Sequence, residues 1–375
     1  MLRFFKKKEN EKASLQGTPK KTDTHFYPLT VSEVRRETAD AVSVAFEMTE
    51  DLREKFTYMP GQYLTLKVNI GGEEVRRSYS ICSAPHEGEL RVAIKQIEGG
   101  KFSSWANTTL QKGMVLESMP PMGNFKWEHS GEGKHYVGWA AGSGITPIAA
   151  IAKSVLHSDS SSTFTLFYGN RNAGTVIFKE ELEDLKNQYL NRFELHHIMS
   201  GAEHQNDEPK GRIDGDKATA FHGKFFDSSS TEAHYLCGPL GMIEGVSAAL
   251  ESLGTPKERI HFELFNTAGA STEASKAVES RASGKSSVTV ILDGVETHFE
   301  MGPKDLLLDA AMDNGADAPF ACKGAVCCTC RAKVLEGTAE MVMNYALVDD
   351  EVKDGYILTC QTHATSDKLV VSFDE

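Results

Sequence analysis

Four cysteines have a spacing that suits a metal cluster. Cys322, Cys327 and Cys330 follow one another as C-x4-C-x2-C, and Cys360 comes thirty residues later. This is the ligand order of a plant-type [2Fe–2S] centre, in which a tight loop presents three thiolates and a distant segment closes the cage. Gly324 is expected to help the loop turn through its freedom at positive φ, while nearby amides bond the sulfurs. The spacing therefore predicts these four cysteines as metal ligands.

Two other uses of four cysteines fit the chain less well. A structural zinc site usually takes its ligands as two closely spaced pairs. A disulfide framework is disfavoured in a long acidic chain whose start lacks the apolar stretch of a secretory signal. Cys328, between two ligands, is expected to be a non-ligand thiol. Cys82 and Cys237 are also expected to be reduced thiols, which is typical of a cytoplasmic protein.

Two segments of the first third carry residues suited to a large planar cofactor with phosphates. The run 77–80 reads Arg-Ser-Tyr-Ser, and the run 99–104 reads Gly-Gly-Lys-Phe-Ser-Ser before a helix-like stretch over 105–110. An Arg clamps a phosphate and a Tyr lies flat on a conjugated ring, while glycines and hydroxyls before a helix form an anion site. Each segment alone also fits an ordinary strand or an ordinary Ser N-cap.

A glycine turn stands between a predicted apolar strand over 136–141 and a predicted helix over 148–157. The turn reads Gly-Ser-Gly-Ile-Thr-Pro over 142–147. Glycines in this context let the backbone approach a pyrophosphate held at a helix N-terminus. The next predicted strand, over 164–168, leads into Arg171. An Arg at this edge suits a ribose 2′-phosphate and favours NADPH over NADH, although Arg171 as a plain exposed residue is the alternative.

The charge and the apolar runs exclude some functions. The net charge is −13, which argues against nucleic acid as a partner. From residue 286 to 375 the chain has six Lys and Arg against sixteen Asp and Glu, a net charge of −10. A domain whose net charge is this negative can attract a basic partner toward the predicted cluster, although a single charged residue usually only solvates the surface. No stretch approaches the roughly 20 apolar residues of a membrane helix.

Taken together, the motifs resemble one superfamily over nearly the whole chain. Arg77-x-Tyr79-Ser80, the turn 142–147, Cys237-Gly238-Pro239 and the cysteine pattern stand in the order of ferredoxin–NADP⁺ reductase-like flavoproteins fused to a plant-type ferredoxin. Six lesser segments look like the reductase subunits of phenylacetyl-CoA epoxidases: 77–82, 168–171, 211–214, 265–267, 344–347 and 355–361. Two positions depart from the pattern, because Ala325 stands where relatives often have a second glycine and Trp139 is bulky before the glycine turn.

The resemblance implies a multi-domain fold. A disordered basic tail over 1–22 precedes an antiparallel β-barrel flavin domain over 23–130. An α/β Rossmann-like nucleotide domain follows over 131–268. A linker over 269–286, long enough to let the last domain move, leads to a β-grasp ferredoxin domain over 287–375.

The resemblance also implies the site residues. The FAD contacts are Arg77, Ser78, Tyr79, Ser80, Gly100, Phe102, Ser103 and Phe265. The NADPH contacts are Gly142, Gly144, Thr146, Pro147, Asn170, Arg171, Cys237, Gly238 and Pro239. Ser80 near the flavin N5, Cys237 beside the nicotinamide and Glu263 on the far side of the flavin are the catalytic candidates.

The implied activity is stepwise electron transfer. NADPH delivers two electrons at once, the cluster accepts one at a time, and the flavin converts between the two. The expected acceptor is the di-iron oxygenase that epoxidises phenylacetyl-CoA. A Rieske dioxygenase or a desaturase is the alternative acceptor, and a redox sensor or passive carrier is the alternative outside enzymes.

Overall fold

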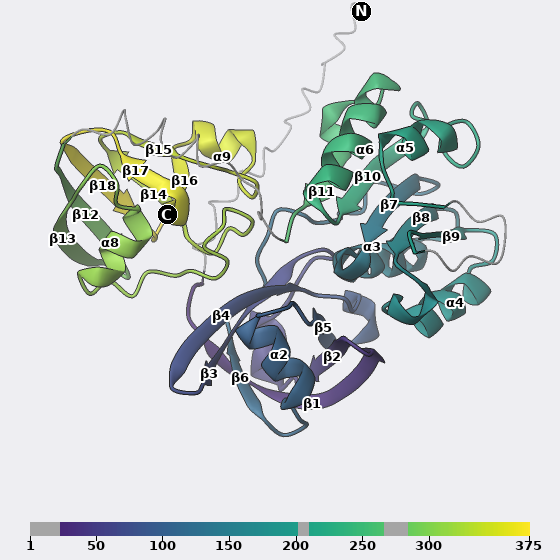
Figure 1. Ribbon diagram of the computed structural model, residues 1–375, viewed down its shortest axis with the longest axis horizontal. Helices are drawn as coiled ribbons and strands as arrows, with labels where there is room; N and C mark the ends of the chain where they lie inside the picture. The colour runs from purple at the N-terminus through teal and green to yellow at the C-terminus, as the bar shows by residue number, and fades with distance from the viewer. Residues whose placement is uncertain (1–22, 202–209, 266–283) are drawn as a thin grey trace, which may run out of the picture.

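The computed structural model describes residues 23–201, 210–265 and 284–375. Figure 1 shows three bodies in chain order: a barrel, an α/β domain and a C-terminal domain. The expected basic tail and nearly all of the expected linker lie outside the described residues. None of the helices in the described ranges has the length and apolar character needed to cross a membrane.

Six antiparallel strands form the barrel in the order β4-β3-β6-β1-β2-β5. Their bounds are β1 Tyr27–Thr38, β2 Ala41–Phe46, β3 Tyr63–Ile70, β4 Glu73–Ser80, β5 Leu90–Lys95 and β6 Val115–Ser118. A bridge between Ile81 and Val92 joins the two ends of this order and closes the barrel. Alternating Leu and Val side chains fill its core. The helices α1 (Glu50–Lys55) and α2 (Lys101–Thr108) complete the domain, with the short turn η1 (Pro85–Glu87).

The α/β domain is built on five parallel strands in the order β11-β10-β7-β8-β9. The strands are β7 His135–Ala141, β8 Thr163–Asn170, β9 Phe193–Met199, β10 Thr231–Cys237 and β11 Ile260–Glu263. The helices are α3 Ile145–Ser158, α4 Lys179–Gln188, α5 Gly215–Phe221 and α6 Leu240–Ser252. Three short 3₁₀ turns belong to it: η2 Gly142–Gly144, η3 Ala173–Thr175 and η4 Lys257–Arg259.

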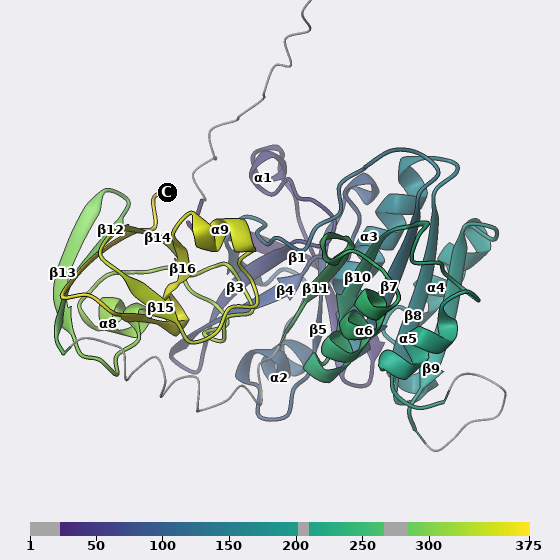
Figure 2. The same cartoon turned by 90° about the horizontal axis from the view of Figure 1, so that it is seen from above.

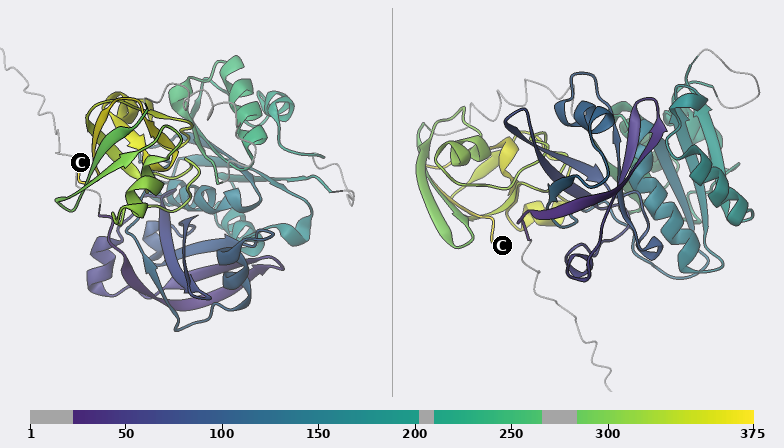
Figure 3. Two further views of the ribbon diagram at one scale, coloured as in Figure 1. Left: turned by 60° about the vertical axis from the view of Figure 1, so that its left-hand side comes forward. Right: turned by 90° about the horizontal axis from the view of Figure 1, so that it is seen from below.

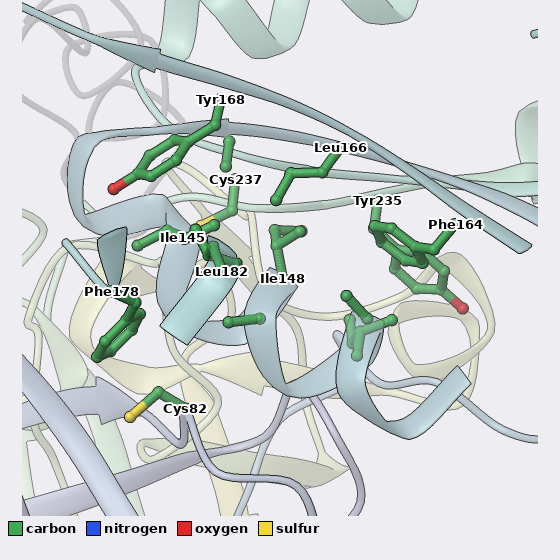
Figure 4. Packing of buried hydrophobic residues seen from close by; sticks show 14 of the residues in the cluster. Cys82, Ile145, Ile148, Phe164, Leu166, Tyr168, Phe178, Leu182, Tyr235 and Cys237 are labelled. Atoms are coloured by element: carbon green, nitrogen blue, oxygen red, sulfur yellow. The ribbon is translucent and has the colours of Figure 1, made fainter. Parts of the chain in front are cut away.

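Helices cover both faces of this sheet, because its strands are apolar on both sides. One core holds α3 and α4 residues with Phe164 and Leu166, and the other holds α5 and α6 residues with Trp139 and Phe167. Figure 4 shows Ile148 of α3 close to the sheet residues of the first core. Trp139 stacks on Phe167 with 4.5 Å between ring centroids. Its bulk therefore lies on the α5–α6 face, away from α3.

A buried ion triad joins the barrel to the α/β domain. Lys153 of α3 has a side chain only 8% exposed, and its ammonium lies 2.9 Å from Glu87 and 2.7 Å from Glu181. Burial alone disfavours the charged amine, but Glu181 and Glu87 outweigh it and raise the pKa of Lys153. The lysine is therefore held charged between two domains.

The C-terminal domain has a mixed five-stranded sheet in the order β13-β12-β18-β14-β16. Its strands are β12 Ser286–Leu292, β13 Val295–Met301, β14 Arg331–Glu336, β16 Tyr356–Leu358 and β18 Lys368–Ser372. The remaining elements are α8 Leu307–Asp313, α9 Asp349–Lys353, η5 Thr359–Gln361 and the pair β15 Ala339–Met341 and β17 Thr362–Ala364. The β12–β13 turn has positive φ at Asp293 and Gly294, as a tight two-residue hairpin requires.

The C-terminal domain lies beside the β3–β4 side of the barrel in Figures 1 and 2, and both views of Figure 3 agree. Arg76 of β4 makes part of this contact, since its guanidinium lies 4.5 Å from the Phe320 ring and 3.4 Å from the Asp317 carboxylate. Segments more than 200 residues apart in the chain therefore meet at one interface.

Candidate functional site

The cluster loop, residues 320–330, brings three of the predicted metal ligands together. The Cys327 thiol donates to Cys322 Sγ at 3.1 Å, and the Gly324 N–H donates to the same sulfur at 3.3 Å. Cys360, in η5, lies against both Cys322 and Cys330. Hydrogen bonds among these thiols lower the pKa of Cys322 and raise the pKa values of Cys327 and Cys360, because neighbouring sulfurs lie within hydrogen-bonding distance of one another.

The arrangement of the four sulfurs fits a two-iron centre. The four thiols form a row, Cys327–Cys322–Cys360–Cys330, which suits two cysteines per iron. Cys328 points away from this row, and its Sγ lies 3.3 Å from the carbonyl oxygen of Ala346.

The loop turns at positions other than the expected one. Lys323 and Ala325 have φ of 51° and 58°, whereas Gly324 is absent from the positive-φ residues of the described chain. The expectation that Gly324 supplies the left-handed residue was therefore wrong. Ala325 adopts that conformation although it costs an L-residue roughly 1–2 kcal/mol. Its methyl group is fully buried in the core of the C-terminal domain, which offsets part of the cost.

The run Arg77–Ser80 ends strand β4 at the junction of the barrel with the α/β domain. Arg77 is exposed, Ser78 and Tyr79 are partly buried, and Ser80 is buried. The Tyr79 ring lies 5.3 Å from the ring of Phe102, which is itself 1% exposed. Phe102 thus supports Tyr79 from the barrel core, while the exposed Arg77 is accessible to a phosphate.

The second predicted phosphate segment begins α2. Gly100 is the N-cap of this helix. Ser103 Oγ accepts from the Ile97 N–H at 3.1 Å and donates to the Gly100 carbonyl oxygen at 3.3 Å. The Ser103 hydroxyl therefore already stabilises the turn, and its contact with a cofactor phosphate stays a prediction.

The glycine turn lies at the carboxyl edge of the parallel sheet, between β7 and α3. Gly142 has φ of 54°, and its carbonyl oxygen accepts from the Tyr168 hydroxyl at 3.1 Å. A Cβ on Gly144 would lie 2.0 Å from the Cys237 carbonyl oxygen, so only glycine fits there. Thr146 Oγ1 donates to the Ser143 carbonyl oxygen at 3.0 Å. The turn and the end of β10 are thus in backbone contact.

Neighbouring strand ends bring further predicted nucleotide residues to the same edge. Asn170 ends β8 and is buried, and Arg171 after it is exposed. A Cβ on Gly238 would lie 2.6 Å from the end of the flexible Met242 side chain, which would have to shift. Pro239 is the N-cap of α6. Pro147 falls in the first turn of α3, where its missing N–H has no cost.

The three catalytic candidates meet where the barrel joins the α/β domain. Cys237 is opposite Glu263 in the parallel register of β10 and β11. The Ser80 hydroxyl donates to Glu263 Oε2 at 2.8 Å across the domain boundary. Burial raises the pKa of Glu263 to about 8, although the bond from Ser80 lowers it, and burial raises that of Cys237 as well. The Glu263 and Cys237 side chains are therefore both protonated at neutral pH. Phe265, two residues beyond Glu263, has a side chain that is 41% exposed.

A cavity of about 790 Å³ opens where the three domains meet. Glu263 of the α/β domain, Tyr63 of the barrel and Cys327 of the cluster loop all line it. One predicted catalytic residue, Glu263, and one predicted metal ligand, Cys327, therefore line the same cavity. Sequence reasoning missed Tyr63, because a Tyr in a strand of alternating residues carries no chemical signal until its partner domain is in place.

Comparison with known proteins follows the same three-part division. The family model "Oxidoreductase FAD-binding domain" matches residues 28–127, "Oxidoreductase NAD-binding domain" matches 139–248, and "2Fe-2S iron-sulfur cluster binding domain" matches 290–365. The chain is 42% identical to a component of the 1,2-phenylacetyl-CoA epoxidase of Escherichia coli, over 94% of this chain and 98% of that protein. This chain belongs to the family of phenylacetyl-CoA epoxidase reductase components.

More distant relatives have the same architecture. The ferredoxin reductase component of 3-ketosteroid-9-alpha-monooxygenase from Rhodococcus rhodochrous is 33% identical, over 92% of this chain and 96% of that protein. The solved structure of phthalate dioxygenase reductase matches 92% of this chain and 98% of its own, with a TM-score of 0.56 and 22% identity. That structural likeness supports the predicted fold of barrel, parallel α/β sheet and ferredoxin domain.

The family establishes the general activity. The protein is an NAD(P)H-dependent oxidoreductase that passes electrons through FAD to a [2Fe–2S] cluster, as the reductase component of an oxygenase system. The expected cofactor classes, fold and electron-transfer role are confirmed. The site residues named above, the preference for NADPH and the individual acceptor remain predictions.

Proposed function

We propose that this reductase supplies electrons from NADPH to a di-iron oxygenase that epoxidises the ring of phenylacetyl-CoA. The 42% identity to a phenylacetyl-CoA epoxidase component over nearly the full length of both proteins carries this proposal. The 3-ketosteroid monooxygenase component is 33% identical, which makes a steroid-hydroxylating oxygenase the second candidate acceptor. Bound flavin would supply the conversion from a two-electron donor to a one-electron acceptor.

The chain's own residues would position the reactants. Tyr79, supported by Phe102, offers a ring face to the flavin, and Arg77 offers a cation to its phosphates. The glycine turn presents backbone to the nucleotide, and Gly144 lets it lie against the end of β10. Ser80 and Glu263 hold a proton in a buried hydrogen bond at 2.8 Å. We assign this hydrogen bond the role of keeping the Ser80–Glu263 edge of the proposed flavin site uncharged and inaccessible to water.

The acceptor is tested by reconstitution. The purified holoprotein is mixed with NADPH and either the phenylacetyl-CoA oxygenase or the 3-ketosteroid oxygenase, and product formation per NADPH consumed is measured. The proposal expects coupled turnover at least tenfold faster with the phenylacetyl-CoA enzyme. Equal or faster turnover with the steroid enzyme contradicts it, as does NADPH oxidation that reaches neither oxygenase.

The preference for NADPH is proposed from Arg171, which stands exposed at the end of β8. An Arg there suits a 2′-phosphate. Arg171→Gln should raise KM for NADPH about tenfold and leave KM for NADH within twofold, measured by ferricyanide reduction. Arg212→Gln, at another exposed arginine of the α/β domain, is the matched control, with no change for either nucleotide. An equal effect of Arg171→Gln on both nucleotides would refute the assignment.

The oxygenase surface is proposed to be basic. The C-terminal domain has a net charge of −10 over residues 286–375, and such a domain attracts a basic partner at low salt. The apparent association rate with the oxygenase should therefore fall steeply with ionic strength. None of the seven cysteines, all of which lie in the described ranges, forms a disulfide. This supports the further proposal that the protein works in the reducing cytoplasm.

A further inference from the structure

The cluster loop packs directly against strand β3 of the barrel. Tyr63 is 3% exposed and forms a small buried group with Ala321 and Cys327. Its hydroxyl oxygen accepts a hydrogen bond from the Cys328 backbone N–H at 2.9 Å and lies 3.4 Å from Thr329 Oγ1. A buried hydroxyl of one domain is therefore bonded to the loop that carries the metal ligands of another.

Tyr63 is also close to the predicted flavin contacts. It lies directly opposite Ser80 in the antiparallel register of β3 and β4. Opposite residues of such a pair share one face of the sheet, with Cβ atoms about 5 Å apart. Ser80 in turn donates to Glu263. One residue thus separates the Ser80–Glu263 pair from the cluster ligand Cys327.

Two other contacts between these domains reach side chains of the ligand run: Thr65 Oγ1 lies 3.1 Å from Thr329 Oγ1, and Asn124 Nδ2 lies 3.8 Å from Cys328 Sγ. Further contacts involve residues outside this run. Arg76 meets Phe320 and Asp317, which precede the first ligand. Asn124 Nδ2 donates to the Ala346 carbonyl oxygen at 3.2 Å and to Glu351 at 2.7 Å. These contacts hold the C-terminal domain on the barrel, whereas Tyr63 holds the peptide between two ligands.

We propose that Tyr63 is a positioning residue for electron transfer from the flavin to the cluster. Its hydroxyl anchors the Cys328 N–H and so holds the Cys327 side of the loop against β3, the strand paired with the one that carries the predicted flavin contacts. Electron transfer weakens steeply with distance, so a small displacement of this loop slows it. Tyr63 itself is neither oxidised nor deprotonated, because one electron leaves the reduced flavin and the oxidised cluster accepts it. The inference uses the established route from FAD to [2Fe–2S] and does not depend on which oxygenase follows.

The test is Tyr63→Phe in the holoprotein, which keeps the ring and removes the hydroxyl. The Cys328 N–H is then buried without its acceptor. In single-turnover stopped flow, reduction of the cluster by the flavin should slow about tenfold. Reduction of the flavin by NADPH, and steady-state ferricyanide reduction, should stay within twofold. Hydrogen exchange at the Cys328 amide should accelerate about tenfold while peptides of α3 and β7 remain unchanged.

Two further variants make the result decisive. Tyr58→Phe is the matched control, because the Tyr58 hydroxyl bonds a backbone group within the barrel alone, donating to the Ser83 carbonyl oxygen at 3.0 Å. It should change neither the cluster reduction rate nor the exchange of the cluster loop. Thr329→Val removes the loop hydroxyl that lies 3.4 Å from the Tyr63 hydroxyl and 3.1 Å from the Thr65 hydroxyl. It should show the same selective slowing as Tyr63→Phe, but to a smaller extent.

The result that overturns the proposal is equally specific. Flavin-to-cluster transfer at the wild-type rate in both Tyr63→Phe and Thr329→Val refutes it. Equal slowing of flavin reduction and cluster reduction also refutes it, since that pattern reports general loosening of the fold. If cluster reduction slows to the same extent in Tyr58→Phe, the effect again reports general loosening of the fold and refutes the proposal. A protein whose flavin is not reduced by NADPH in any variant would instead contradict the nucleotide preference proposed above.

Discussion

Glu263 offers a quantitative test of the buried junction between the barrel and the α/β domain. Its carboxyl group is buried, and burial raises its pKa from 4.5 to about 8 despite the hydrogen bond from Ser80. Below pH 4.5 the folded and unfolded chains both hold the proton. Between pH 4.5 and 8 the unfolded chain releases it and the folded protein keeps it, so stability falls as the pH rises.

The size of this effect follows from the shift. Each pH unit inside the window costs about 1.4 kcal/mol, so the interval from pH 5 to pH 7.5 costs on the order of 3 kcal/mol. Glu263→Gln keeps the shape and an oxygen acceptor for Ser80 but has no proton to lose. The variant should therefore gain about 3 kcal/mol relative to wild type as the pH rises across this interval.

Thermal unfolding of the two holoproteins measures the difference. For domains of this size, about 3 kcal/mol corresponds to a relative shift in Tm of roughly 6–12 °C. Glu258→Gln, an exposed change nearby in the sequence, serves as the control and should show no pH-dependent difference from wild type. A constant difference between Glu263→Gln and wild type from pH 5 to pH 7.5 would mean that Glu263 titrates normally, and the reasoning would fail.

Two further predictions concern tight contacts elsewhere. Gly144→Ala places a Cβ 2.0 Å from the Cys237 carbonyl oxygen, so kcat/KM for NADPH should fall at least tenfold while the FAD content stays unchanged. Gly241→Ala is the control, because its Cβ meets nothing within 4 Å, and it should leave kcat/KM unchanged. Equal effects of the two variants would disprove the close-contact argument. Lys153→Met removes the cation between two glutamates and should cost about 3 kcal/mol in thermal unfolding. Lys353→Met, at an exposed ion pair, is the control and should leave the unfolding temperature unchanged; equal losses in the two variants would show that burial of the triad adds no stability.

Much of the fold was predictable because local patterns report local structure. The expected strands over 136–141 and 164–168 fall within β7 and β8, and the glycine turn does stand between β7 and α3. Strands β1 and β6 have a weaker signal in the sequence, because polar residues interrupt their apolar alternation. Strand β18 was missed for another reason: its place between β12 and β14 depends on pairing with segments far away in the chain.

The candidate site also has a part that the sequence predicted and a part that only the structure showed. Spacing alone indicated the four cluster cysteines, since ligand geometry imposes a fixed order on nearby residues. The glycine turn was visible for the same reason. The hydrogen bond between Ser80 and Glu263 was not, because 183 residues separate its partners. The left-handed conformation of Ala325 was also invisible, since alanine gives no sign that its backbone is strained.

By itself, then, the order of residues determined which cofactors this protein holds, because each cofactor needs short motifs whose members are neighbours in the chain. Only the tertiary structure decided how those cofactor sites face one another. The contact of Tyr63 with the cluster loop and that of Ser80 with Glu263 exist because separate domains pack together. Such packing depends on the shape and burial of whole surfaces, which no short stretch of sequence encodes.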